Sequence, residues 1–276
     1  MKLRDGDPRL GLSESRWLVL TSGMGSEDFE AAAARVVSQA TRLPGVTRAI
    51  AVTTKDLPEV CPKTTEMYGH LQNRVHRGWG YWAYKSEIIA RAFDGYWGEF
   101  DGYVWIDSGC EVFVNPISAQ RFLRFQQRAL QTGASVFTLK TPESLYTKNL
   151  LFREFSDLDP LDSTDQIQNT FYLLSGDKGK KIANRWLKTT LISTAHSDDS
   201  ISADSEPIGF VRNTGDQSVF SLVCKSEGVT PMKYTPATGA NSRIGKIRAL
   251  SHPIWVSRNR TGKSVIPKFL QKLCGL

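Results

Sequence analysis

Apolar and polar positions alternate along the first half of the chain with the periods of strands and helices in turn. The pattern predicts strands over 17–21, 47–53, 103–106 and 134–139, and helices over 27–43, 85–100 and 116–131. Residues 54–78 are polar and contain proline, so we expect a long loop there. This alternation is typical of an α/β fold with a mainly parallel central sheet flanked by helices.

The second half of the chain is less regular. Residues 193–206 are rich in Ser, Asp and Ala and are predicted to form a mobile loop. We interpret the chain as one domain, residues 1–276. A site opened by residues 14–140 is completed by residues 141–262, and a basic segment, 263–276, follows.

Size and composition fit a globular protein. The 276 residues are 40% apolar and 23% charged, which is ordinary for a soluble domain. No apolar run approaches the ~20 residues that a membrane span needs, and the N-terminus has no apolar signal segment. The cysteines occur singly, at Cys61, Cys110, Cys224 and Cys274. Single cysteines fit a reducing compartment, so we expect a cytoplasmic protein.

Basic residues outnumber acidic ones, 35 to 28, which gives a net charge of +7. Much of the excess lies near the C-terminus, at Arg243, Lys246, Arg248, Arg258, Arg260, Lys263, Lys268 and Lys272. Such an excess favours phosphates, nucleic acid or anionic lipid, and charge alone does not choose among them.

The predicted strand over 103–106 runs directly into Asp107 and a turn of small residues. In an open α/β sheet this places the carboxylate at the carboxyl edge, where ligands bind. A carboxylate there suits a divalent cation that holds a diphosphate. Alternatively, Asp107 only caps the turn after the strand.

Four aromatic residues and two glycines fill residues 78–84, just before Lys85. Such a segment suits a platform on which a base or sugar stacks. A lysine at the start of a helix is electrostatically unfavourable and indicates an anionic partner. The alternative is that Trp79 and Trp82 face the core.

Asp216 follows Gly215 and precedes an apolar helical stretch. Helix capping alone explains an aspartate at this position.

Together these segments resemble a family of bacterial glycosyltransferases of the GT-A type, found in capsule and surface-polysaccharide gene clusters. The resemblance rests on residues 78–85, the Asp-Ser-Gly-Cys-Glu motif at 107–111, Gln166-Ile167, and the Asp-Gln-Ser segment at 216–221. It covers roughly residues 70–262. It implies a GT-A-like single domain with a nucleotide-sugar half (14–140) and an acceptor half (141–262).

The resemblance also implies a divalent metal, Mn²⁺ or Mg²⁺, because carboxylate and phosphate oxygens are hard ligands. The family's Asp-x-Asp motif is incomplete here, since Gly109 stands at its third position. The expected ligands are therefore Asp107, Glu111 and His252. Alternatively, the site depends less on metal and more on basic side chains.

Negative charge grows on the departing diphosphate during glycosyl transfer, so cations near it stabilise the transition state. Arg258 and Arg260 are the first candidates, with His252 and Lys85 as alternatives. The residues expected to bind the donor are Trp82, Lys85, Asp107, Ser108, Arg258 and Arg260.

The resemblance indicates Asp216 as the base for the acceptor hydroxyl, with Gln166 beside the anomeric carbon. If the reaction retains configuration, Gln166 instead steadies the sugar and the departing phosphate takes the proton. The sequence leaves both outcomes open.

The predicted function is transfer of a sugar from a nucleotide-diphosphate donor to a saccharide or lipid-linked acceptor in surface-polysaccharide synthesis. The loop over 193–206 is a candidate lid, and the basic end, residues 258–272, is a candidate for contact with anionic membrane. One alternative is a non-catalytic nucleotide-sugar or saccharide binding protein with a degenerate GT-A fold. A nucleic-acid-binding protein is disfavoured, because only Arg77 and Lys85 accompany the aromatic block.

Overall fold

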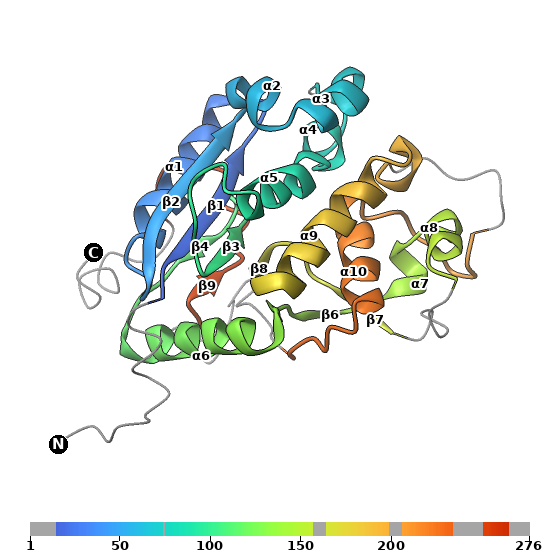
Figure 1. Cartoon of the computed structure of the whole chain (residues 1–276). Coiled ribbons are helices and arrows are strands. Elements are labelled where there is room, and N and C mark those ends of the chain that lie inside the picture. The colour runs from blue at the N-terminus through green and yellow to red at the C-terminus, as the bar shows by residue number, and fades with distance from the viewer. Residues whose placement is uncertain (1–14, 74, 157–163, 199–205, 234–250, 265–276) are drawn as a thin grey trace.

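The computed structural model describes residues 15–73, 75–156, 164–198, 206–233 and 251–264 (Figure 1). Its strands are β1 (Trp17–Gly23), β2 (Val46–Thr53), β3 (Gly102–Ile106), β4 (Glu111–Val112), β5 (Ala134–Ser135), β6 (Thr138–Pro142), β7 (Asp165–Ile167), β8 (Phe171–Ser175) and β9 (Ile254–Trp255). Its helices are α1 (Glu27–Ala40), α2 (Leu57–Val60), α3 (Pro62–Tyr68), α4 (Gly78–Tyr81), α5 (Tyr84–Phe93), α6 (Pro116–Thr132), α7 (Glu143–Tyr146), α8 (Asn149–Glu154), α9 (Gly176–Thr190) and α10 (Asp216–Ser226).

A five-stranded sheet in the order β2-β1-β3-β8-β5 forms the centre of the fold. β1 pairs in parallel with both β2 and β3, whereas β8 runs antiparallel to β3 and to β5. All strands except β8 therefore point the same way. The predicted α/β class, with a mainly parallel sheet flanked by helices, is confirmed.

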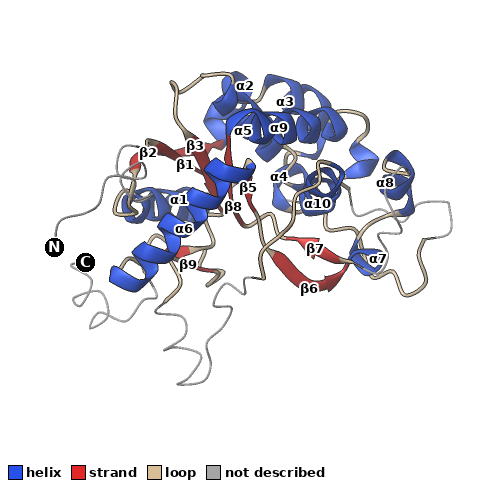
Figure 2. Ribbon diagram, turned by 60° about the horizontal axis from the view of Figure 1, so that its bottom comes forward, coloured by secondary structure: helices blue, strands red, loops and turns tan. Residues whose placement is uncertain are grey.

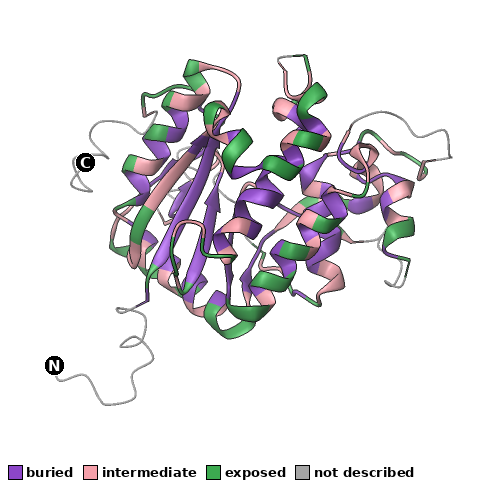
Figure 3. Cartoon of the chain, turned by 45° about the horizontal axis from the view of Figure 1, so that its top comes forward, coloured by how far each residue is buried: buried purple, intermediate pink, exposed green. Residues whose placement is uncertain are grey.

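The central strands are buried on both faces (Figure 3). In β1, Leu18 and Leu20 face one hydrophobic core, and Trp17 and Val19 face the other, as the two-residue period of a strand requires. The first core is completed by α5, α9 and α10, and the second by α1 and α6. Figure 2 shows these helices on the two sides of the sheet. Because helices cover both faces of the sheet, the ends of its strands are held in place, and the site is built at these ends.

Two small antiparallel sheets extend the fold beyond the central one. β4 pairs with β9, which brings the segment after Trp255 against the Asp107–Glu111 turn. β6 pairs with β7 beside α7 and α10. Segments distant in sequence therefore meet at one edge of the central sheet.

Most predicted elements of the first half are confirmed, and the differences have local causes. The predicted loop over 54–78 is wrong, since it contains α2 and α3, both with a proline in the first turn. The helix predicted over 85–100 ends at Phe93, because Gly95, with a φ of 82°, turns the chain. The strand predicted over 134–139 is split into β5 and β6.

No described helix combines the length and apolar character needed to cross a membrane. Of the candidate lid, residues 199–205 lie outside the described residues, as do residues 265–276 of the basic C-terminal segment.

Candidate functional site

A cleft of about 1510 Å³ opens at the edge of the sheet where β1 and β3 end and β8 begins. Because β1 and β3 are parallel, their carboxyl ends meet there, as is usual for ligand sites in open α/β sheets. The start of α10 and the segment after β9 supply further walls. The lining includes these candidates from the sequence: Trp79, Trp82, Lys85, Asp107, Ser108, Asp216, Arg258 and Arg260.

A buried ammonium group joins two carboxylates at the cleft. Lys85 Nζ lies 2.8 Å from Asp107 Oδ1 and 3.1 Å from Asp216 Oδ2, and only 3% of Lys85 is exposed. Asp107 Oδ1 also accepts a hydrogen bond of 2.7 Å from Trp105 Nε1, and Asn169 Nδ2 donates one of 2.6 Å to Asp216 Oδ2. We call Lys85, Asp107, Asp216 and Asn169 the cleft cluster. Three elements distant in sequence thus bring their charges together.

Burial shifts the protonation equilibria of the cleft cluster. Desolvation raises the pKa of Asp216 to about 7, and the charge of Asp107 adds to this rise, while Lys85 opposes it. The pKa of Lys85 is raised despite the opposing effect of its own burial, because Asp107 and Asp216 both stabilise its charge. Lys85 therefore stays charged, and Asp216 exchanges its proton near neutral pH.

Asn169 is a site residue that the sequence interpretation missed. It lies between β7 and β8, lines the cleft, and is 2% exposed. Its amide nitrogen is bonded to Asp216, but its Oδ1 has no hydrogen-bond partner among the described residues. A buried amide oxygen without a donor is costly, so a ligand hydroxyl is a suitable partner. The polar run after Ile167 was the only signal for it in the sequence.

The aromatic block forms a turn of unusual handedness beside the cleft. Trp79, Tyr81 and Trp82 have φ values of 54°, 56° and 59°. The φ values of Gly78 and Gly80, which precede and separate them, are also positive. Non-glycine residues in this region are strained by about 1–3 kcal/mol each, and such strain clusters at functional sites. Trp79 and Trp82 pack against the core, as one of the two sequence interpretations expected, and they also line the cleft; stacking of a base or sugar on them stays a prediction.

The segment after β9 supplies the arginines. Arg258 and Arg260 are exposed, line the cleft, and pair with no carboxylate among the described residues. The carbonyl of Gly109 accepts from Asn259 N and from Ser257 Oγ, both at 3.0 Å. The Asp107–Glu111 turn therefore positions the arginine segment.

A second buried cluster anchors this segment from behind. The Arg35 guanidinium, on α1, donates to the carbonyls of Ser108, Cys110, Asn259, Thr261 and Lys263. Glu111 accepts from Gln39 Nε2 at 3.3 Å, from Asn259 Nδ2 at 2.8 Å, and from Ser264 Oγ. We call Arg35, Gln39, Glu111 and Asn259 the anchor cluster. Glu111 does not line the cleft.

The three residues predicted to bind metal are not brought together. The side chain of Glu111 is held in the anchor cluster, and a ring nitrogen of His252 lies 2.7 Å from Arg121 Nη1. Burial and the Arg121 charge lower the pKa of His252 to about 4. Within the described part of the chain, no three His, Cys, Asp or Glu residues form a group that could hold a metal ion.

Asp107 itself is a poor metal ligand in this arrangement, because Lys85 already occupies one of its oxygens. A divalent cation about 4 Å from the ammonium would be repelled by roughly 8 kcal/mol at an effective dielectric constant near 20, which offsets much of its attraction to the carboxylates. The residues present therefore do not fit Mn²⁺ or Mg²⁺.

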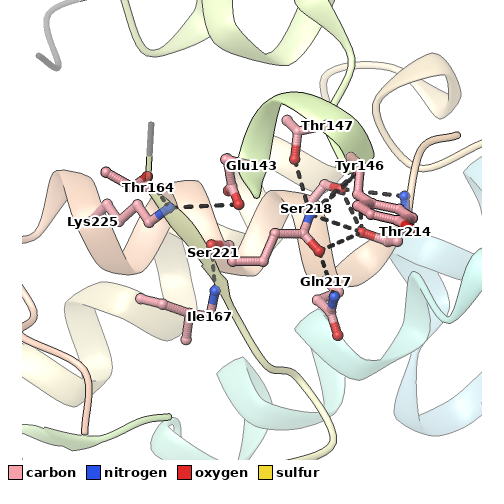
Figure 4. Close-up of polar contacts among 11 residues, drawn as sticks. Glu143, Tyr146, Thr147, Thr164, Ile167, Thr214, Gln217, Ser218, Ser221 and Lys225 are labelled. Carbon is pink, nitrogen blue, oxygen red and sulfur yellow. Dashed lines mark hydrogen bonds and ion pairs between the residues drawn. The ribbon is translucent and has the colours of Figure 1, made fainter. Parts of the chain in front are cut away.

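Gln166 is not among the residues that line the cleft; its partners Thr147, Thr214 and Gln217 are labelled in Figure 4. Its amide nitrogen is 3.0 Å from the hydroxyls of both Thr147 and Thr214, and its Oε1 accepts from Gln217 Nε2 at 2.7 Å. Gln166 is the middle residue of β7, and its side chain faces α10. It therefore lies at a junction of α7, β7 and α10. Gln217, which does line the cleft, is the connection between this junction and the site.

The part of the cleft lining that β6 and the segments after it supply is basic. Lys140 on β6, Arg212 before α10, and Lys233 are exposed and line the cleft. Asp165 is the acidic residue that this wall adds to the lining.

No protein-family model matches the chain, and no curated protein matches its sequence. The solved structures that align with it include two glycosyltransferases. Mouse xyloside xylosyltransferase 1, in its apo form, is 11% identical, with a TM-score of 0.43 and coverage of 89% of this chain and 99% of that one. The apo structure of WbbM, a bifunctional glycosyltransferase, is 9% identical, with a TM-score of 0.42 and coverage of 88% and 45%. Likenesses this distant assign no role to individual residues of this chain.

Proposed function

We propose that the protein is a glycosyltransferase that moves a sugar from a nucleotide-diphosphate donor to a saccharide or lipid-linked acceptor. The observation that carries the proposal is the convergence, in one cleft, of two carboxylates, Asp107 and Asp216, with two arginines that have no carboxylate partner among the described residues. Such a site offers a proton acceptor and a counter-charge for a leaving diphosphate in the same space.

The donor binds at the part of the cleft lined by Trp82, Ser108, Arg258 and Arg260. Arg258 and Arg260 face the diphosphate, and their charges stabilise it most as the glycosidic bond breaks. Trp82, with Arg77 at 5.7 Å and Lys85 at 5.9 Å from its ring, offers a stacking surface for the base or the sugar. Ser108 lines the same wall.

Asp216 acts as the base. Its oxygen accepts the proton of the acceptor hydroxyl as that hydroxyl attacks the anomeric carbon, and the diphosphate leaves with the electron pair of the broken bond. A pKa of about 7 suits this role, because the carboxylate is available near neutral pH and still binds the proton strongly. If configuration is retained, the departing phosphate takes the proton instead.

Gln166 acts as a positioning residue in this scheme. It fixes Gln217 through the 2.7 Å hydrogen bond, and Gln217 borders the same helix turn as Asp216. The basic wall with Lys140, Arg212 and Lys233 then receives the acceptor, and it suits one that carries a phosphate or an acidic sugar. A cytoplasmic role in surface-polysaccharide synthesis is consistent with such an acceptor.

The proposal is tested by thermal stabilisation with a panel of nucleoside diphosphates and nucleotide sugars, followed by assay of nucleoside diphosphate release with saccharide acceptors. Binding to the folded state raises the melting temperature by mass action. We expect one nucleotide to stabilise the wild type and to lose about tenfold in affinity in Arg258→Ala, equivalent to about 1.4 kcal/mol.

The matched control is Arg48→Ala, which removes an exposed arginine on β2 that bonds the Trp97 carbonyl. It should bind the nucleotide as the wild type does. No stabilisation by any nucleotide at millimolar concentration would overturn the proposal. Stabilisation without turnover for any acceptor would favour the non-catalytic alternative.

A further inference from the structure

An ammonium group occupies the place in the cleft where the resemblance implies a divalent cation. Lys85 Nζ bridges Asp107 and Asp216, the two carboxylates that line this part of the cleft. We infer that Lys85 is the built-in cation of the site, so that a nucleoside diphosphate binds there without Mn²⁺ or Mg²⁺. This inference rests on the proposed function and deepens it.

The bonding of Lys85 supports a fixed role rather than direct contact with phosphate. An ammonium has three N–H donors. Lys85 Nζ lies near three protein oxygens, Asp107 Oδ1 at 2.8 Å, Asp216 Oδ2 at 3.1 Å, and the Asn169 carbonyl at 3.5 Å. All three donors are therefore used within the protein. A ligand phosphate would have to displace a carboxylate to reach them.

The surroundings of Lys85 hold it in place. Its nitrogen lies 5.5 Å from the Trp105 ring and 5.9 Å from the Trp82 ring, both within the range of cation–π attraction. Opposite charges on both sides and aromatic rings nearby keep the group charged and immobile. A metal ion could enter only by displacing a buried, fully bonded cation.

The charge needed by a diphosphate must then come from elsewhere in the cleft. Lys85 at most balances one of the two carboxylates, so the cleft cluster does not itself attract phosphate. Arg258 and Arg260 are the exposed cations of the same cleft, and the anchor cluster holds their backbone. Lys85 therefore offsets the charge of one carboxylate, and the arginines bind the phosphates.

The first test uses the unmodified protein and Mn²⁺ alone, with free Mn²⁺ followed by electron paramagnetic resonance. We expect no one-to-one Mn²⁺ site. In parallel, calorimetry with adenosine, guanosine, uridine and cytidine diphosphates is run in EDTA and in Mn²⁺. The affinity of the nucleotide that binds should agree within about twofold between the two conditions.

The second test removes the ammonium. Lys85→Met keeps an unbranched apolar stem and leaves the two carboxylates without a cation, so we expect Mn²⁺ to bind at least about tenfold more tightly than to the wild type. Lys148→Met is the control, because Lys148 is also buried and paired with a carboxylate, Asp198, but neither residue lines the cleft. It should gain no Mn²⁺ site. If Lys85→Met does not fold, the wild-type measurements decide alone.

The inference is overturned by a one-to-one Mn²⁺ site in the wild type that Asp107→Asn removes, or by a tenfold loss of nucleotide affinity in EDTA. It also fails if a folded Lys85→Met binds Mn²⁺ no better than Lys148→Met does. Absence of nucleotide binding in both conditions would instead overturn the proposed function, and the Mn²⁺ titrations would still decide the role of Lys85.

Discussion

Two carboxylates four residues apart, Asp107 and Glu111, each interact with a buried cation, Asp107 in an ion pair with Lys85 and Glu111 through the charge of Arg35, yet only Asp107 lines the cleft. In the anchor cluster, Glu111 is wholly buried and its oxygens accept from three protein donors. In the cleft cluster, Asp107 remains 29% exposed, and Asn169 Oδ1 has no partner among the described residues.

The difference shows that similar charged residues stabilise the fold in the anchor cluster and form a candidate reactive site in the cleft cluster. A buried polar network whose members are nearly all bonded makes its surroundings rigid, and of the anchor-cluster side chains only Arg35 Nε lacks a partner among the described residues. A partly open one, with a carboxylate pKa moved toward neutrality, is typical of a functional site. The Asp107–Glu111 turn joins the two clusters, because the carbonyl of its Gly109 accepts a hydrogen bond from the arginine segment.

The largest expected effect is on the anchor cluster. Arg35→Ala should lower the free energy of unfolding by about 3–5 kcal/mol, because Glu111 keeps a buried charge and five carbonyls lose their donor. Urea denaturation measures it. Arg48→Ala, at an exposed site, should change stability by less than about 0.5 kcal/mol. Equal effects of the two substitutions would contradict a stabilising role for the anchor cluster.

A smaller effect sharpens the link between the clusters. Glu111→Gln keeps the size of the side chain but loses its charge, and should cost about 1–3 kcal/mol of stability. It should also weaken nucleoside diphosphate binding about fivefold, roughly 1 kcal/mol, because the segment carrying Arg258 and Arg260 is held less firmly. Calorimetry and limited proteolysis of this segment report both effects. An unchanged affinity in the destabilised variant would show that the two clusters act independently.

The cleft cluster should give the protein a pH-dependent stability. Burial raises the pKa of Asp216 from 3.8 to about 7, so between about pH 4 and 7 the folded protein holds a proton that the unfolded chain has released. The free energy of unfolding therefore falls as the pH rises through this window, by up to about 1.4 kcal/mol per pH unit. Asp216→Asn should remove this part of the slope in denaturation curves measured from pH 4 to 8.

Glu143 provides the control for that experiment. Its burial raises its pKa to about 7 as well, but it lies beside Lys225, outside the cleft (Figure 4). Glu143→Gln should flatten the stability curve in the same window, and only Asp216→Asn should also abolish turnover. Identical pH curves for the wild type and Asp216→Asn would contradict the shifted pKa.

The smallest expected effect is at His252. His252→Gln should change nucleoside diphosphate affinity by less than about twofold, or about 0.4 kcal/mol, because this side chain contacts Arg121 rather than the cleft. The same calorimetry in Mn²⁺ and in EDTA measures it. A tenfold loss confined to the Mn²⁺ condition would restore His252 as a metal ligand.

Local patterns in the sequence were sufficient where burial is regular. The strands around Leu18 and Val104 could be predicted because short apolar runs bounded by turn residues have few other solutions. Asp107 could be placed at the sheet edge for the same reason, because it directly follows the last residue of a predicted strand. The helices within residues 57–68 could not, because isolated helices of this length depend on tertiary packing rather than on propensity.

The sequence by itself determined the α/β class and the segments that carry the charges of the site. Only the tertiary structure decided which charges meet. Lys85 was predicted to have an anionic partner, and the structure shows it between Asp107 and Asp216; Glu111 was a predicted metal ligand, and its side chain is held in the anchor cluster. The physical reason is that a pairing between residues tens of positions apart depends on strand order and helix packing, which local periodicity does not encode.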